Sequence, residues 1–313
     1  MNDNKKINYS LELLRLILSF WVVVHHTYRY LYLFRKGLFP VPTFLIISFY
    51  FYYNTLIKKD IIKIKQRFQR ILIPYIIWPI LLFIFNNILL KLTKFSLYNR
   101  KLLLIDLAIQ FIIGRRYHPI FYYQFILIFL TIIFTLISFL FNKSCIFIFQ
   151  VLLIVAYIFQ YSYLNLYIFK RNSYNIKYSL GLIFEFLPCV VMGVILRHLD
   201  ISVKLKQFKS LTIIYIGIIL FVSLKFDIFA NIKGYFYPGV LYNIGGNCIF
   251  ILFSLLSFQN KVLIFLLKII TKFTGGIYYI HLLCFDILKR KFFFIKHTTF
   301  RGSITIYLIC FIT

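Results

Sequence analysis

The sequence predicts an all-α fold, a polytopic bundle of membrane helices. Of its 313 residues, 62% are hydrophobic and only 14% are charged, which is far more apolar than the roughly half-apolar average of soluble domains. The apolar residues form runs of about 20 residues separated by short basic clusters, the pattern of successive membrane spans. This composition excludes a soluble enzyme.

Apolar runs of spanning length follow one another along almost the whole chain, so about ten spans are expected. They cover residues 9–32, 38–57, 71–93, 118–141, 145–163, 178–197, 211–229, 238–257 and 274–290, with a truncated last span at 302–313.

Two further features complete this organisation. The segment 102–113 is apolar, too short to span and carries Asp106, so an interfacial or re-entrant piece is expected there. The first run lacks the small-residue cleavage site of a signal peptide, so it is expected to remain as a span. Because no internal repeat or linker is visible, residues 1–313 are expected to form a single membrane domain.

The chain is strongly basic, with 36 Lys and Arg against 8 Asp and Glu and a formal net charge of +28. In a soluble protein this balance would indicate a nucleic-acid partner. Here the basic residues lie between apolar runs, so we expect contact with membrane lipid and no nucleic acid. The clusters at 58–70 and 197–209 favour a cytoplasmic N-terminus, whereas those at 115–116 and 289–301 oppose it. Early spans usually dominate insertion, so we expect a cytoplasmic N-terminus.

The five cysteines lie inside apolar runs and show neither Cys-x-x-Cys nor Cys/His ligand spacing. We therefore expect small packing residues, with no disulfide and no metal site.

Ionisable residues in the first span are candidates for function, because a charge at the centre of a span costs about 2.5–3.5 kcal/mol. Glu12 and Arg15 are three residues apart on one face, where a structural ion pair is the alternative. His26 follows Arg15 by about 1,100° of helical rotation and roughly 16 Å, so these two also share a face. His26 could take a proton from a hydroxyl or simply bond a neighbouring helix, whereas His25 points about 100° away and is expected to pack.

A second candidate site is formed by Arg67 and Arg70, which are three residues apart just before Pro74. Two guanidiniums on one helical face can form a bidentate site for phosphates. The alternative is a pair of ordinary positive-inside residues, which is the interpretation we prefer for Lys58 and Lys59.

In order and spacing these residues resemble the membrane acyltransferase 3 family, over nearly the whole chain. The matching elements are Glu12 and Arg15 followed by His26 and Thr27, Arg67 and Arg70 followed by Pro74 and Tyr75, His118, and Gly276, Tyr278, Tyr279 and His281. The resemblance implies ten spans and an enzyme that acylates hydroxyl groups of cell-surface sugars. It also implies acyl-CoA, expected to be acetyl-CoA, as a co-substrate from the cytoplasm, with no permanently bound cofactor.

The resemblance also implies roles for individual residues. His26 matches the catalytic histidine and Arg15 the first-span arginine, so we group both with Glu12 as catalytic candidates. Arg67 and Arg70 match the pair that is associated with the acyl donor.

The chain departs from the family pattern in three places. Phe49 follows Ser48 where many relatives have glycine, and Phe121 stands where they have a tryptophan motif. Tyr122 and Tyr123 stand where some relatives carry a glutamate. The carboxylate partner of the histidine is therefore not identified.

The function expected is an integral membrane O-acyltransferase of the cell membrane, acting on a surface or exported glycan. The alternative is a polysaccharide exporter, since buried histidine and arginine also fit a substrate pathway, although no interrupted spans in matching halves are visible. A structural subunit of a synthase complex would need no buried charge. Direct transfer and an acyl-histidine relay both remain open, as do the acceptor and the oligomeric state.

Overall fold

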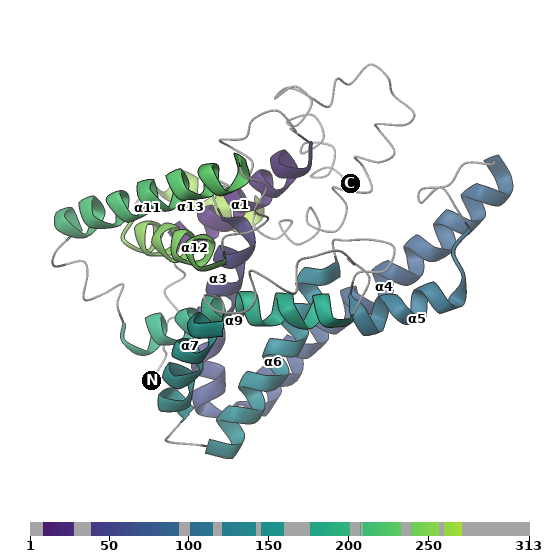
Figure 1. Ribbon diagram of the computed structural model, residues 1–313, viewed down its shortest axis with the longest axis horizontal. Coiled ribbons are helices and arrows are strands. Elements are labelled where there is room, and N and C mark those ends of the chain that lie inside the picture. The colour runs from purple at the N-terminus through teal and green to yellow at the C-terminus, as the bar shows by residue number, and fades with distance from the viewer. Residues whose placement is uncertain are drawn as a thin grey trace. The chain divides into compact units, whose positions relative to one another are not determined.

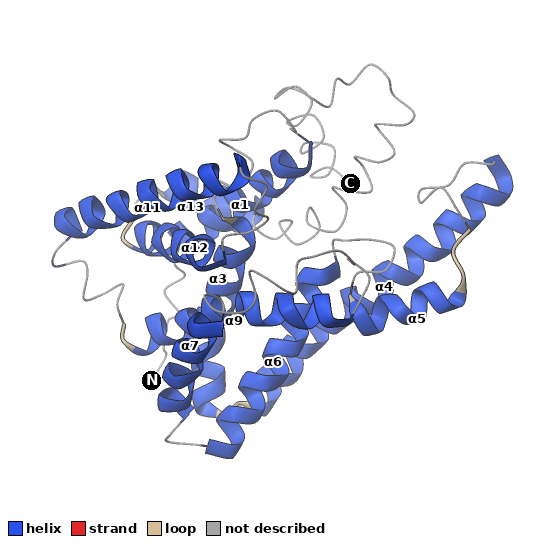
Figure 2. Ribbon diagram, viewed as in Figure 1, coloured by secondary structure: helices blue, strands red, loops and turns tan. Residues whose placement is uncertain are grey.

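The computed structural model describes residues 9–27, 39–93, 101–114, 121–141, 145–159, 176–200, 207, 209–232, 239–256 and 260–270. In this part of the chain there are ten α-helices and no strand (Figures 1 and 2). The helices are α1 (Tyr9–Thr27), α3 (Pro40–Lys58), α4 (Ile61–Thr93), α5 (Leu104–Ile113), α6 (Phe121–Phe141), α7 (Cys145–Phe159), α9 (Ile176–His198), α11 (Lys209–Ile232), α12 (Gly239–Ser254) and α13 (Lys261–Ile270). The predicted all-α class is confirmed.

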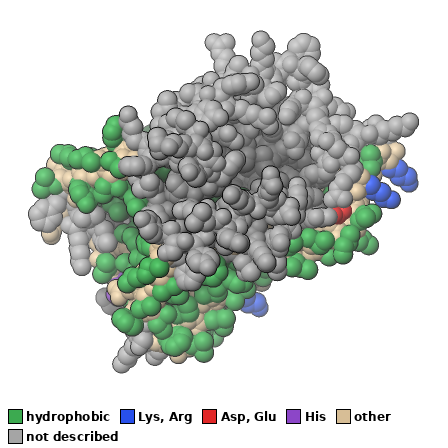
Figure 3. All heavy atoms as spheres, in the orientation of Figure 1, with side chains coloured by type: hydrophobic (Ala, Val, Ile, Leu, Met, Phe, Trp, Pro, Cys, Tyr) green, Lys and Arg blue, Asp and Glu red, His purple; other side chains and the backbone are tan. Residues whose placement is uncertain are grey.

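The helices have the apolar character of a membrane bundle. By length and composition, α4, α6 and α9 each contain a segment that could cross a membrane, and α5, α7, α11 and α12 contain shorter apolar segments. Large hydrophobic side chains on several of these helices are exposed, and most of the described side chains visible in Figure 3 are hydrophobic. Such surfaces suit contact with lipid. The expected spans at 274–290 and 302–313 lie outside the described residues.

Two helices differ from the expected pattern. Helix α4 begins at Ile61, ten residues before the span expected at 71–93, so the basic segment that carries Arg67 and Arg70 is its first part. At 33 residues α4 is about 50 Å long, more than the roughly 30 Å of a hydrocarbon core. Helix α13 was not expected, because its ten residues are too few to form a span.

The described helices belong to two compact units. The first comprises residues 1–47, 196–237 and 241–313, and the second comprises residues 48–195 and 238–240. Helix α3 thus contributes its start to the first unit and its remainder to the second. The single domain expected from the sequence stays a prediction.

In the second unit, α4 packs against α5 and α6, and α6 packs against α7. Aromatic side chains fill the space between α3, α6 and α7. The ring of Phe134 stacks on Phe149 with centroids 4.6 Å apart, and Phe49 meets Phe134 edge-on at 5.2 Å. All three rings are fully buried, so they form a rigid apolar core beside α3.

A tight turn joins α3 to α4. Lys59 adopts a left-handed conformation with φ 50°, and the N–H groups of Lys59 and Asp60 donate to the carbonyls of Leu56 and Thr55, which ends α3. The Asp60 carboxylate then accepts the N–H of Lys63 at 3.1 Å and caps α4. A hydrogen bond from the Lys63 ammonium to this carboxylate lowers the pKa of Asp60.

Helix α5 is fixed to α4 at both of its ends. Near its start, the side-chain amide of Asn87 exchanges two 3.0 Å hydrogen bonds with the backbone of Leu102. Near its end, the Tyr75 hydroxyl donates to the carbonyl of Phe111 at 2.8 Å, and Gly114 closes the helix with φ 74°. The expected interfacial or re-entrant piece is therefore a helix that is anchored on α4.

In the first unit, α12 approaches the start of α3 at two adjacent glycines. A Cβ atom at Gly245 would overlap the ring of the fully buried Phe39, and one at Gly246 would lie 2.9 Å from the Cβ of Pro42. The Thr43 hydroxyl reaches the Gly246 carbonyl at 3.5 Å. Small residues at helix contacts let membrane helices approach closely, and both glycines serve this purpose here.

We predict that Gly245→Ala destabilises the protein by about 1–3 kcal/mol, because its methyl group overpacks the site occupied by Phe39. The thermal midpoint of the purified protein in detergent measures this. Gly217→Ala is the matched control, since no described residue elsewhere in the chain has an atom within 4 Å of a Cβ there, and alanine is the better helix former by about 0.5–1 kcal/mol. An equal rise in midpoint for both variants would contradict the proposed packing.

Candidate functional site

The first-span candidates lie in one uninterrupted helix. Helix α1 runs from Tyr9 to Thr27, so Arg15 and His26 share a helical face, as the spacing predicted. The Arg15 guanidinium donates to both oxygens of Glu12, at 3.2 and 3.4 Å. The local ion pair named as the alternative for these two residues is therefore present. The side chains of His25 and His26 lie outside the described residues, and the catalytic roles stay predictions.

Arg67, on α4, is directed toward α3 and α6. Its Nη2 donates to the Ser48 hydroxyl at 2.9 Å, Nη1 to the Ser48 carbonyl at 3.3 Å, and Nε to the Thr131 hydroxyl at 3.4 Å. The guanidinium carbon also lies 4.1 Å from the ring centroid of Tyr52 and 4.9 Å from that of Phe49. Hydrogen bonds and cation–π contacts thus hold this half-buried cation within the protein.

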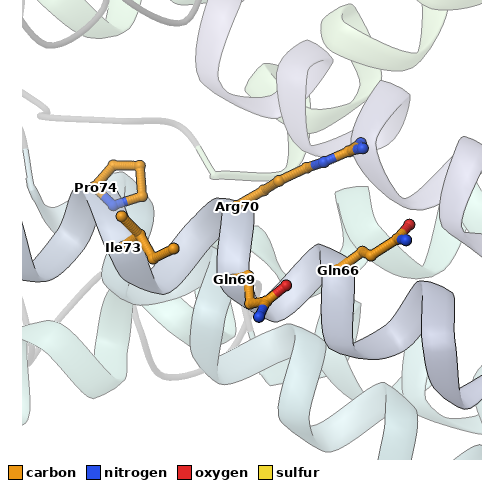
Figure 4. A pocket seen from close by; sticks show the side chains of 5 residues that line it. All are labelled: Gln66, Gln69, Arg70, Ile73 and Pro74. Carbon is orange, nitrogen blue, oxygen red and sulfur yellow. The ribbon is translucent and has the colours of Figure 1, made fainter.

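Arg70 lies one turn further along α4 in a different environment. Its side chain is exposed and, within the part of the chain that the structure describes, it makes no hydrogen bond or ion pair. It lines a pocket of about 380 Å³, and in Figure 4 its extended side chain stands clear of the helix. The pocket is also lined by Gln66, Gln69, Ile73 and Pro74.

The two arginines therefore do not share one site in this structure. Residues three apart on a helix differ in direction by about 60°, which is enough to turn Arg67 toward the protein and Arg70 toward the pocket. A pocket with one guanidinium and two carboxamides offers several hydrogen-bond donors to a phosphate group. The donor-binding roles of both arginines stay predictions, but the geometry favours Arg70.

Sequence reasoning missed four polar residues around these arginines. Gln66 and Gln69 line the pocket, and their spacing of four and one residues from Arg70 could have placed them near it. Ser48 and Thr131, the partners of Arg67, are single hydroxyl residues within apolar runs. Nothing in the sequence pairs them with an arginine on a third helix.

The other polar residues that the sequence singled out lie mostly outside the described part of the chain. His118, Arg115, Arg116 and the segment 275–281 lie outside the described residues. Glu185 is buried within α9, one turn before the fully buried Cys189. Among the residues described, no group of His, Cys, Asp and Glu could hold a metal ion, and Cys145, Cys189 and Cys248 are buried free thiols.

Comparison with protein families finds that the acyltransferase 3 model, described as an acyltransferase domain, matches residues 8–313. Comparisons with curated proteins and with solved structures find no match. The family match takes in every described helix, including α1 with Arg15 and α4 with Arg70. Together with the apolar helices, it shows that the chain belongs to the acyltransferase 3 family and is a membrane acyltransferase.

Proposed function

We propose that this acyltransferase moves an acyl group, acetyl in the first instance, from acyl-CoA to a hydroxyl of a cell-surface or exported glycan. The family match supports acyl transfer, and the apolar helices support a membrane location. The observation that carries the choice of donor is the pocket on α4, where Arg70 stands with Gln66 and Gln69. A polysaccharide exporter would need no acyl transfer, so the family match favours the acyltransferase over this alternative.

The chemistry of the α4 pocket fits the phosphate-bearing part of CoA. A guanidinium binds phosphate oxygens through paired N–H donors, and carboxamide groups add further donors. The pocket volume of about 380 Å³ lies in the range of about 300–1,000 Å³ that is typical of small-molecule sites. Gln66, Gln69 and Arg70 are all exposed, so a soluble donor could reach them.

In the transfer step, His26 accepts the proton of the glycan hydroxyl, whose oxygen attacks the thioester carbonyl. The new ester C–O bond forms as the thioester C–S bond breaks, and the proton passes to the departing CoA sulfur. In a relay, the His26 nitrogen would first carry the acyl group. Arg15, paired with Glu12, places a cation on the same face of α1.

This scheme requires a multi-pass protein of the cell membrane with a cytoplasmic N-terminus. Two crossings later, the start of α4 would then face the cytoplasmic acyl-CoA pool, and the glycan would approach from outside. The basic cluster at 58–70 supports this orientation.

We predict that His26→Ala lowers acyl transfer to the glycan by about 10²–10⁴-fold, the usual contribution of a general base. Glycan O-acylation should be compared in cells that carry each variant at matched membrane abundance. His25→Ala is the neighbouring control and should keep most of the activity, because position 25 lies about 100° around the helix from position 26. Full activity of His26→Ala would remove the histidine from the mechanism.

Arg70→Ala should weaken CoA binding by about 1.5–3 kcal/mol, the range for a charge-assisted hydrogen bond, and Arg70→Lys should restore it only in part. Binding of CoA to the purified protein in detergent measures both effects. Lys65→Ala removes one exposed positive charge from the same helix outside the pocket and serves as the control. If Lys65→Ala and Arg70→Ala weaken binding equally, general charge rather than the pocket attracts CoA.

A further inference from the structure

The contacts of Arg67 indicate that the two arginines of α4 have different tasks. We propose that Arg67 is a positioning residue, which fixes α4 on α3 and α6 so that Arg70 faces the donor, and which does not itself contact CoA. This inference rests on the proposed function, because it assigns the donor phosphates to the Arg70 pocket alone.

The Arg67 guanidinium already has hydrogen-bond partners within the protein. All three of its nitrogens donate to groups within the protein, two of them to Ser48 and one to Thr131. The rings of Tyr52 and Phe49 lie within 5 Å of its central carbon. A phosphate could bind Arg67 only after some of these contacts had been lost. The loss would be costly, because these hydrogen bonds and ring contacts stabilise a cation in apolar surroundings.

The groups around Arg67 are themselves held in place by further contacts. The Thr131 hydroxyl donates to the Leu127 carbonyl at 2.6 Å, and the hydroxyls of Tyr52 and Thr135 hydrogen-bond at 2.9 Å. Phe49 packs edge-on against the buried core ring of Phe134. The Arg67 side chain is therefore surrounded by groups that are themselves fixed, as expected for a contact that holds one helix against others.

The contacts of Arg67 also determine how α4 is rotated about its own axis. Arg67 and Arg70 differ by about 4.5 Å along the helix and about 60° around it. Because the Ser48 and Thr131 contacts fix the direction in which Arg67 leaves α4, they also fix the direction of the Arg70 face. Loss of the anchor would let the helix roll and would move Arg70 relative to a bound donor.

Three single substitutions and two double substitutions test this role through the affinity of the purified protein for CoA. Ser48→Ala removes an Arg67 partner without touching either arginine, and it should weaken CoA binding roughly threefold or more. Combined with Arg67→Gln, its effect should be less than the product of the two, because both break one contact. Combined with Arg70→Gln, its effect should also be less than the product of the two, because Ser48→Ala weakens binding by displacing Arg70.

The salt dependence of CoA affinity separates a positioning residue from a direct ligand. Arg67→Gln and Arg70→Gln each remove one positive charge, but loss of a direct phosphate contact should flatten the salt dependence of CoA affinity more than loss of a charge that lies further from the phosphates. We therefore expect a larger flattening for Arg70→Gln than for Arg67→Gln. Ser48→Ala, which is the milder change, keeps the test valid if Arg67→Gln does not fold.

Ser138→Ala provides the matched control for general destabilisation. It removes a 2.6 Å hydrogen bond from Ser138 to the Leu56 carbonyl in the same unit, so it should lower the thermal midpoint without changing CoA affinity. Unchanged affinity in Ser48→Ala, or a salt dependence that is flattened as much in Arg67→Gln as in Arg70→Gln, would overturn the positioning role alone. Absence of CoA binding by the wild-type protein would overturn the proposed function and this role with it.

Discussion

The packing of the second unit depends on the contacts that stabilise one cation, Arg67, among apolar helices. The Arg67 guanidinium would be costly there without partners, and Ser48, Thr131 and the rings of Tyr52 and Phe49 supply them. These contacts join three helices at one point. They set the position of α4, and hydrogen bonds from Tyr75 and Asn87 of α4 in turn hold α5.

Helix α4 consequently has two faces with different chemistry. One face contacts the interior of the unit through Arg67, and the other presents Arg70 to a pocket that Gln66 and Gln69 also line. In α1 the positive charge of Arg15 is likewise paired within the protein, with the carboxylate of Glu12 one turn away. In α4 the charge of Arg67, which is bonded to Ser48 and Thr131, lies one turn from Arg70, to which we assign donor binding, so small changes in these structural contacts should affect the site.

Much of the fold could be predicted, because long apolar runs and basic clusters directly reflect the bilayer. The start of α4 could not, since a charged segment such as 61–70 gives no hydropathy signal, and its helix begins from the Asp60 cap. At the site, the Glu12–Arg15 pair was foreseeable because it is local in sequence. The separation of Arg67 from Arg70 was not, because it depends on Ser48 and Thr131, which lie 19 and 64 residues from Arg67.

The central claim is that the Arg70 face of α4 meets acyl-CoA on the cytoplasmic side of the membrane. A cysteine-free protein carrying Gln69→Cys tests it most directly through labelling with a membrane-impermeant maleimide, with Lys65→Cys as the control. We predict no labelling of either variant in intact cells, labelling of both after permeabilisation, and protection by CoA of Gln69→Cys only. Labelling of Gln69→Cys in intact cells, or equal labelling with and without CoA, would contradict the claim.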